Sequence, residues 1–237
     1  NISHLYELAI LLNKNSKLYC IDGDIILGEE KPEALYDEYE KFGEKFVLAR
    51  TRANIIEIIK EVYEFYENAR KEVTKNQVFV LVKNFQFLDV VKAMAKGDIV
   101  DERDYLQSNE VKQDNDEDDI ANMFDFGIDD TPAETNITTK FLKLIDEGFA
   151  YGIHFIFTSM EFQSVRECMY YGENILPKFP ERYVFSLGNS DADTLIDGVS
   201  VSSLQDNTVY YTDSIKNTFQ LKPYVFPSKE ELKKFIQ

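Results

Sequence analysis

Polar residues follow three apolar stretches of the sequence that have the composition of buried strands. They are Asp22 after residues 17–21, Lys83 and Asn84 after residues 78–82, and Thr158 and Ser159 at the end of residues 153–159. Two carboxylates at the end of such a strand can hold Mg²⁺ and orient a water molecule for attack on a phosphate. Lys83 cannot hold Mg²⁺, and Asn84 cannot take a proton from water. The end of the stretch 78–82 is therefore predicted to lack the chemistry of metal-dependent hydrolysis.

Lys83 and Asp22 each have a functional and a structural interpretation. Lys83 could contact a nucleotide phosphate in place of a metal ion, or it could pair with an acidic residue such as Asp22. Asp22 could contact a metal or a nucleotide, or its carboxylate could cap a neighbouring turn. The structural interpretation is favoured for both, because a charged residue at a strand end is usually solvated or paired. His154 lies in an apolar strand and is predicted to be a core histidine with a hydrogen-bond partner.

The composition is that of a globular chain with an uneven charge. The 237 residues are 44% hydrophobic, enough for one large or two small domains, and the formal net charge is −17. Fourteen acidic residues between Asp98 and Glu134 are set against only Arg103 and Lys112, so this stretch carries most of the charge. Such acidity argues against general wrapping of nucleic acid by the surface of the chain.

Membrane insertion is not predicted, because no apolar run reaches the roughly 18 residues that a membrane helix needs. Cys20 and Cys168 lie far apart without metal-type spacing and are expected to be reduced core residues. We therefore expect a cytoplasmic location, or the cytosolic part of a membrane-tethered protein.

The periodicity of apolar residues predicts strands that alternate with helices. Predicted strands cover residues 17–21, 46–48, 78–82, 153–158 and 182–187, and predicted helices cover 5–12, 32–42, 54–75, 89–96, 139–148, 161–171, 190–196 and 228–236. A C-terminal β-hairpin is predicted from residues 208–212 and 218–221, and the acidic stretch 98–135 is predicted to be a solvated insertion. This alternation favours an α/β fold with a mostly parallel sheet and helices on both faces. A ligand site is expected at the carboxyl ends of the strands.

The order of several motifs resembles the FtsK/SpoIIIE family of ring-forming motor ATPases. The matching segments are residues 18–23 (LYCIDG), 66–70 (YENAR), 78–88, 151–159 (YGIHFIFTS), 180–185 (PERYVF), 189–193 (NSDAD) and 219–224 (FQLKPY). The resemblance covers nearly the whole chain and implies one P-loop NTPase, RecA-like domain over residues 1–237, with the insertion at 98–135. It also implies nucleotide contacts from Asp22, Thr158 and Ser159. Arg182 would act across a subunit boundary, or otherwise pair with an acid such as Asp193.

The chain departs from the family pattern at the positions that carry out hydrolysis. Lys83 stands where the resemblance places the metal-site aspartate, Asn84 where it places the catalytic glutamate, and Ser159 where it places the sensor glutamine. No Gly-x-x-x-x-Gly-Lys-Ser/Thr loop occurs in the sequence. Because its family position would fall just before Asn1, we expect either a C-terminal fragment of a larger protein or a parent protein without this loop.

Three hypotheses follow from these motifs. The leading one is a degenerate, non-hydrolysing motor domain, as in some type VII secretion motors, which packs against sibling ATPase domains or subunits in a ring and has a structural or regulatory role. One alternative is an active DNA translocase that binds ATP and Mg²⁺, with its phosphate loop upstream and Asp22 or Asp89 replacing the missing carboxylate. The other is an interaction module that binds a basic partner through the acidic insertion.

Overall fold

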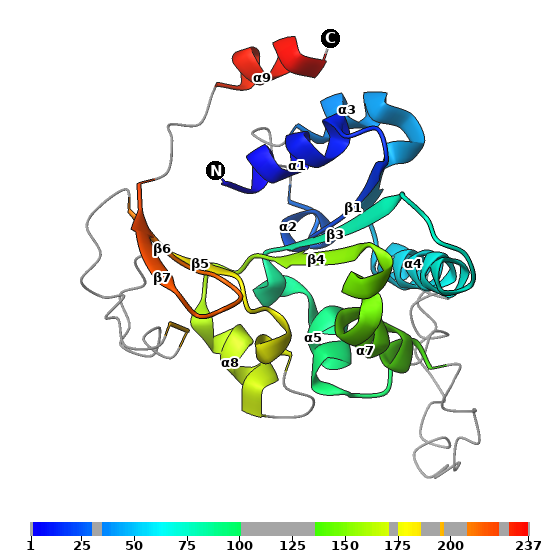
Figure 1. Cartoon of the computed structure of the whole chain (residues 1–237), viewed down its shortest axis with the longest axis vertical. Helices are drawn as coiled ribbons and strands as arrows, with labels where there is room; N and C mark the ends of the chain where they lie inside the picture. The colour runs from blue at the N-terminus through cyan, green and yellow to red at the C-terminus, as the bar shows by residue number, and fades with distance from the viewer. Residues whose placement is uncertain are drawn as a thin grey trace, which may run out of the picture.

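A four-stranded parallel sheet forms the centre of the molecule (Figure 1). The computed structural model describes residues 2–29, 35–100, 136–170, 175–185, 195–196, 208–222 and 228–236. The strands are β1 (Ser16–Asp22), β2 (Phe46–Ala49), β3 (Gln77–Lys83) and β4 (Ile153–Phe157), in the spatial order β2-β1-β3-β4. Every neighbouring pair is parallel, as the alternation of strands and helices predicted. The predicted edge strand at residues 46–48 is confirmed as β2.

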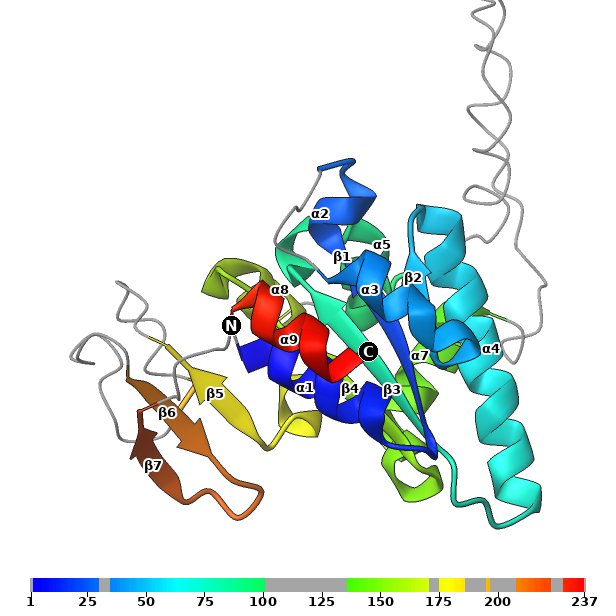
Figure 2. The same cartoon turned by 90° about the horizontal axis from the view of Figure 1, so that it is seen from above.

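Helices cover both faces of this sheet (Figure 2). One face packs on α4 (Arg52–Lys71), α5 (Asp89–Lys96) and α7 (Ile137–Glu147), and the other packs on α1 (Ile2–Leu12) and α3 (Tyr36–Tyr39). Side chains alternate along a strand, so Val78, Val80 and Val82 of β3 join the α4 face while Leu81 joins the α1 face. The same alternation in β1 sends Leu18 and Cys20 to the α1 face. The odd-numbered residues of β3 and the even-numbered residues of β1 therefore face α1.

The ends of two helices have clear local causes. Thr51 caps α4, since its side chain accepts a hydrogen bond from the backbone N–H of Asn54. The helix ends at Lys71, four residues before the predicted end, and Val73 beyond it is fully exposed. The ammonium of Lys45 donates to the carbonyl oxygens of Leu11 and Asn13 at the C-terminus of α1, where the helix dipole favours a cation.

A second, antiparallel sheet is formed by β5 (Arg182–Val184), β6 (Val209–Thr212) and β7 (Thr218–Leu221), in that order. The predicted C-terminal hairpin is confirmed as β6 and β7. Its turn is held by Asp213, whose carboxylate accepts hydrogen bonds from the backbone N–H groups of Ile215 and Asn217. The strand predicted at residues 182–187 is shorter than expected and pairs with the hairpin instead of the parallel sheet.

Shorter elements complete the described part of the chain. They are α2 (Gly23–Ile26), η1 (Glu40–Lys45), η2 (Phe85–Phe87), η5 (Gly148–Tyr151), α8 (Phe162–Tyr170), η6 (Leu176–Lys178) and α9 (Lys229–Ile236). Helix α9 lies beside α3, where Lys233 pairs with Glu38 at 2.8 Å. The predicted helix at 190–196 and the predicted insertion at 98–135 fall almost wholly outside the described residues. Among the described residues, no helix is both long and apolar enough to cross a membrane.

Candidate functional site

The carboxyl ends of β1 and β3 lie side by side at the point where the chain connections diverge. The connection after β1 runs through α3 on one face to β2, whereas the connection after β3 runs through α5 and α7 on the other face to β4. In open α/β sheets, ligands bind at this topological switch point. Asp22 and Lys83 are direct neighbours here in the strand register, and the alternation of each strand turns both side chains toward α1.

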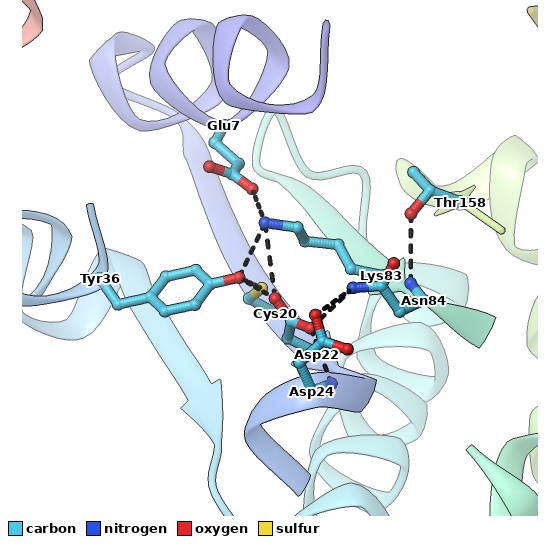
Figure 3. Close-up of polar contacts among 8 residues, drawn as sticks. All are labelled: Glu7, Cys20, Asp22, Asp24, Tyr36, Lys83, Asn84 and Thr158. Carbon is cyan, nitrogen blue, oxygen red and sulfur yellow. Dashed lines mark hydrogen bonds and ion pairs between the residues drawn. The ribbon is translucent and has the colours of Figure 1, made fainter. Parts of the chain in front are cut away.

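The ammonium of Lys83 is buried among oxygen atoms of the protein (Figure 3). It donates to Glu7 Oε1 on α1 at 3.0 Å and to the Tyr36 hydroxyl on α3 at 2.8 Å, and it lies 3.6 Å from Asp22 Oδ2. The side chain of Lys83 is 9% exposed, and those of Glu7 and Asp22 are fully buried. Lys83 therefore joins α1 and α3 to the centre of the sheet, and its pairing with Asp22 is the structural alternative that the sequence favoured.

The protonation states in this cluster follow from burial and charge. Burial alone would lower the pKa of Lys83, but the nearby carboxylates of Glu7 and Asp22 raise it above its usual value, so the lysine stays cationic. Burial raises the pKa of the Cys20 thiol and of the Tyr36 hydroxyl, so both stay protonated. The Cys20 thiol donates to the Tyr36 oxygen at 3.7 Å.

Asp22 accepts three hydrogen bonds and forms one ion pair within the protein. Its Oδ2 atom accepts a hydrogen bond from the Tyr36 hydroxyl at 2.5 Å and faces the ammonium of Lys83. Its Oδ1 atom accepts from the backbone N–H of Asp24 at 3.1 Å and from the side-chain amide of Asn84 at 3.2 Å. The contact with Asp24 caps α2, as the turn-capping interpretation of Asp22 predicted. A carboxylate has about four acceptor sites. Three of those of Asp22 hold hydrogen bonds from the protein, and the ammonium of Lys83 lies beside the carboxylate.

Asn84 closes the space between the two strand ends. Its amide also donates to Asp24 Oδ2 at 2.9 Å, and its backbone has the left-handed conformation that asparagine tolerates, with φ of 53°. The loop approaches Gly23 so closely that a Cβ atom there would lie 2.6 Å from the Asn84 carbonyl oxygen. The switch point is thus filled by backbone and by the side chain of Asn84.

We call these residues the Lys83 network. Its members are Glu7, Cys20, Asp22, Asp24, Tyr36, Lys83 and Asn84 (Figure 3). Among the described residues, no group of three or more His, Cys, Asp or Glu side chains has the arrangement of a metal site. Mg²⁺ does not fit at Asp22, because the ammonium of Lys83 and three hydrogen-bond donors surround the carboxylate. Nor is Lys83 directed toward a phosphate site, since two buried acids hold its charge.

The other predicted site residues have local contacts outside this network or at its border. Thr158 Oγ1 accepts a hydrogen bond from the backbone N–H of Asn84 at 3.3 Å. The Ser159 hydroxyl lies 2.7 Å from the carbonyl oxygen of Glu161 and 3.1 Å from Gln86 Oε1. Arg182 lies on β5. Its guanidinium donates to three backbone carbonyl oxygens, those of Leu176, Phe179 and Leu195. Asp193, its predicted partner, lies outside the described residues.

His154 differs from its prediction in one respect. Its ring stacks on Phe79 at 4.7 Å and meets Phe149 edge-on, so it is an aromatic packing residue of β4. However, Nε2 has no hydrogen-bond partner among the described residues, whereas the sequence predicted one. Partial burial lowers the pKa of His154, which keeps the unpartnered ring neutral at pH 7.

Sequence reasoning missed Glu7, Tyr36 and Asp24. Glu7 had a usable signal, because it is the only acidic residue in the apolar helix of residues 2–12 and an isolated acid there needs a partner. Asp24 follows Asp22 closely and could have been paired with it by position. Tyr36 carried no such signal, since its contact with Lys83 depends on how α3 packs on the sheet.

Comparisons with protein-family models, with curated proteins and with solved structures find no match to this chain. The resemblance to FtsK/SpoIIIE motors therefore stays a prediction from sequence motifs.

Proposed function

We propose that this chain is a non-hydrolysing NTPase-like domain, a degenerate relative of FtsK/SpoIIIE motors, with a structural or regulatory role. The observation that carries the proposal is the occupation of the switch point by the Lys83 network. In a hydrolase this place would hold free carboxylates for a metal ion and for water. Here Asp22 is surrounded by protein donors, and Lys83 pairs with Glu7.

The network supports a role in packing. It draws together side chains from α1, from α3 and from the ends of two central strands, all of them buried. Such polar contacts are satisfied only in one arrangement of the elements, and they therefore favour a single conformation of the domain. A rigid domain of this kind would present a fixed surface to sibling domains or subunits of a ring, which is the partner class that the motif resemblance implies.

Titration calorimetry with Mg-ATP tests the proposal directly. We expect no heat of binding to this chain up to about 1 mM nucleotide, the range of the weakest specific complexes, and no release of phosphate. Binding or Mg²⁺-dependent hydrolysis that disappears in a folded Asn84→Ala variant would overturn the proposal and favour the active alternative. The matched control is Asn76→Ala, at an exposed position before β3.

A further inference from the structure

A row of aromatic rings crosses the second sheet from α1 to the edge strand β7. Tyr183 of β5 and Tyr211 of β6 stack with ring centroids 4.7 Å apart, and Tyr211 stacks on Phe219 of β7 at 6.3 Å. These three are direct cross-strand neighbours. At the other end, the Tyr6 hydroxyl donates to that of Tyr183 at 3.0 Å. Among the described strands, the row ends at Phe219 of β7, the outermost strand of this sheet.

Within its four residues, the edge strand β7 lacks the usual protection against pairing. Among the described strands it pairs with β6 alone, and its four residues, Thr-Phe-Gln-Leu, carry no charge. Natural proteins commonly place charges, prolines or bulges on such edges to prevent association. Phe219 and Leu221 lie on the same face of the strand and are 46% and 41% exposed. This edge therefore offers both free backbone groups and apolar side chains to an added strand.

We propose that β7 pairs antiparallel with β7 of a second copy of this chain, about a two-fold axis at Gln220. The two three-stranded sheets would then form one continuous sheet. Phe219 of each copy would face Leu221 of the other, which continues the aromatic row with an apolar contact on both sides of the axis. Gln220 would face Gln220, and Thr218 would face Lys222, so no like charges meet.

Backbone geometry agrees with this axis. The backbone N–H of Asp213 donates to the carbonyl oxygen of Asn217 at 3.1 Å, and bonded pairs alternate along an antiparallel ladder. The pairs Tyr211–Phe219 and Val209–Leu221 therefore bond within the hairpin, which leaves the peptide groups of Gln220 directed outward. A register centred on Phe219 instead would set Lys216 opposite Lys222, and like charges directly opposite are destabilising.

The inference goes beyond the proposed function, because it needs neither a nucleotide nor the Lys83 network. Failure of the pairing would leave the network and its role unchanged. Conversely, nucleotide binding by this chain would not affect the argument for the β7 edge.

Sedimentation velocity of the full chain over a concentration series tests the pairing. We expect a monomer–dimer equilibrium with a Kd in the micromolar range or weaker, because a pair of short strands buries a small area. Phe219→Glu should weaken the dimer at least about tenfold by placing a carboxylate in the contact. Ile215→Glu is the matched control, since Ile215 is 77% exposed in the hairpin turn and lies off the edge. A wild type that is monomeric up to about 1 mM, or no effect of Phe219→Glu, would overturn the proposal.

The position of the axis has its own test. Gln220→Glu and Gln220→Lys should each weaken self-association, because each variant sets like charges opposite one another. An equimolar mixture of the two should restore dimers to at least the wild-type level, since a glutamate then faces a lysine. Dimerisation of the wild type without recovery in the mixture would exclude an axis at Gln220. Both substitutions are at an exposed position, and circular dichroism would check that the sheet is retained.

Discussion

At the scale of single residues, Lys83 shows how a buried cation holds neighbouring elements of a fold together. Its positive charge offsets the negative charges of two fully buried carboxylates, Glu7 and Asp22. The net gain from such a pair is small, because both charges lose their hydration, but removal of one partner is costly because the opposite charge stays buried without it. Lys83 is therefore needed as long as Glu7 and Asp22 are present.

Lys83→Met is expected to lower the free energy of unfolding by about 3–5 kcal/mol. The methionine fills a similar volume but removes the ammonium that pairs with both Glu7 and Asp22. Urea titration at pH 7, followed by circular dichroism, measures the loss.

Two variants make this measurement specific. Adding Glu7→Gln to Lys83→Met should recover part of the loss, because a neutral amide is cheaper to bury than a carboxylate. Lys17→Met removes the partly exposed pair of Lys17 and Glu61 and should cost less than about 1 kcal/mol. An equal cost for Lys83→Met and Lys17→Met would contradict the importance of the buried network.

Alkaline pH should destabilise the protein from about pH 9 upward. Cys20, Tyr36 and Lys83 all have folded-state pKa values raised above their usual values of 9.0, 10.0 and 10.5. The folded state therefore holds protons that the unfolded chain releases, so the associated stability is complete below pH 9 and falls as the pH rises. Urea midpoints at pH 7, 9 and 10 would show the decrease.

Cys20→Ala separates the contribution of the thiol from the others. The variant removes the group with the lowest usual pKa of the three. The decrease of the free energy of unfolding should therefore begin near pH 10 instead of pH 9. The comparison is between the slopes with pH, because the lost sulfur also leaves a small cavity at every pH. If the wild type were as stable at pH 10 as at pH 7, the buried protons of Cys20, Tyr36 and Lys83 would not contribute to stability as proposed.

At the scale of elements, the junctions β1–α2 and β3–η2 decide whether the switch point is closed. Gly23 and Asn84 bring the two junctions together because glycine has no side chain to hold them apart. Asn84 takes the left-handed conformation at the other junction. The close approach of the two junctions therefore depends on the missing side chain of Gly23, on the left-handed backbone of Asn84 and on the polar contacts between the loops.

Gly23→Ala is expected to destabilise the protein by about 1–3 kcal/mol through overpacking. The added Cβ atom would lie 2.6 Å from the Asn84 carbonyl oxygen and 3.0 Å from Phe87 Cβ, so one junction must move. Gly28→Ala is the control, since its surroundings are open within 4 Å and its cost comes only from a positive φ. When Gly23→Ala is combined with Lys83→Met, the two changes in the free energy of unfolding should not add, whereas those of Gly28→Ala and Lys83→Met should add. If both combinations were additive, the junction at Gly23 would not be coupled to the Lys83 network.

The sequence predicted elements well where the apolar pattern was long and regular. The predicted helix at 89–96 coincides with α5, and the strands at 17–21 and 78–82 lie within β1 and β3. The end of α4 was placed too late, because residues 72–75 are exposed and do not pack against the core. The four-residue helix α2 was missed since it is stabilised by the Asp22 cap and has no periodicity of its own.

At the scale of the whole molecule, topology decides which residues meet. The sequence placed Asp22 and Lys83 at the ends of two predicted strands, and their pairing was among its interpretations. The involvement of Glu7 and Tyr36 could not be predicted, because it requires α1 and α3 to pack over the same strand ends. The pairing of β5 with the hairpin was also beyond local patterns, since an alternating strand does not specify its neighbour.

The placement of β4 beside β3 has a consequence for how the chain folds during synthesis. Val78 pairs with Ile153, and roughly 70 residues separate the end of β3 from the start of β4. At a synthesis rate of roughly 5–20 residues per second, the ribosome needs about 4–14 s to make this interval. During that time β1, β2 and β3 can assemble, but β3 presents an uncovered apolar edge to the surrounding solution. The nascent chain is therefore most vulnerable to aggregation before residue 157 has left the ribosome, and molecular chaperones would be needed most in that interval.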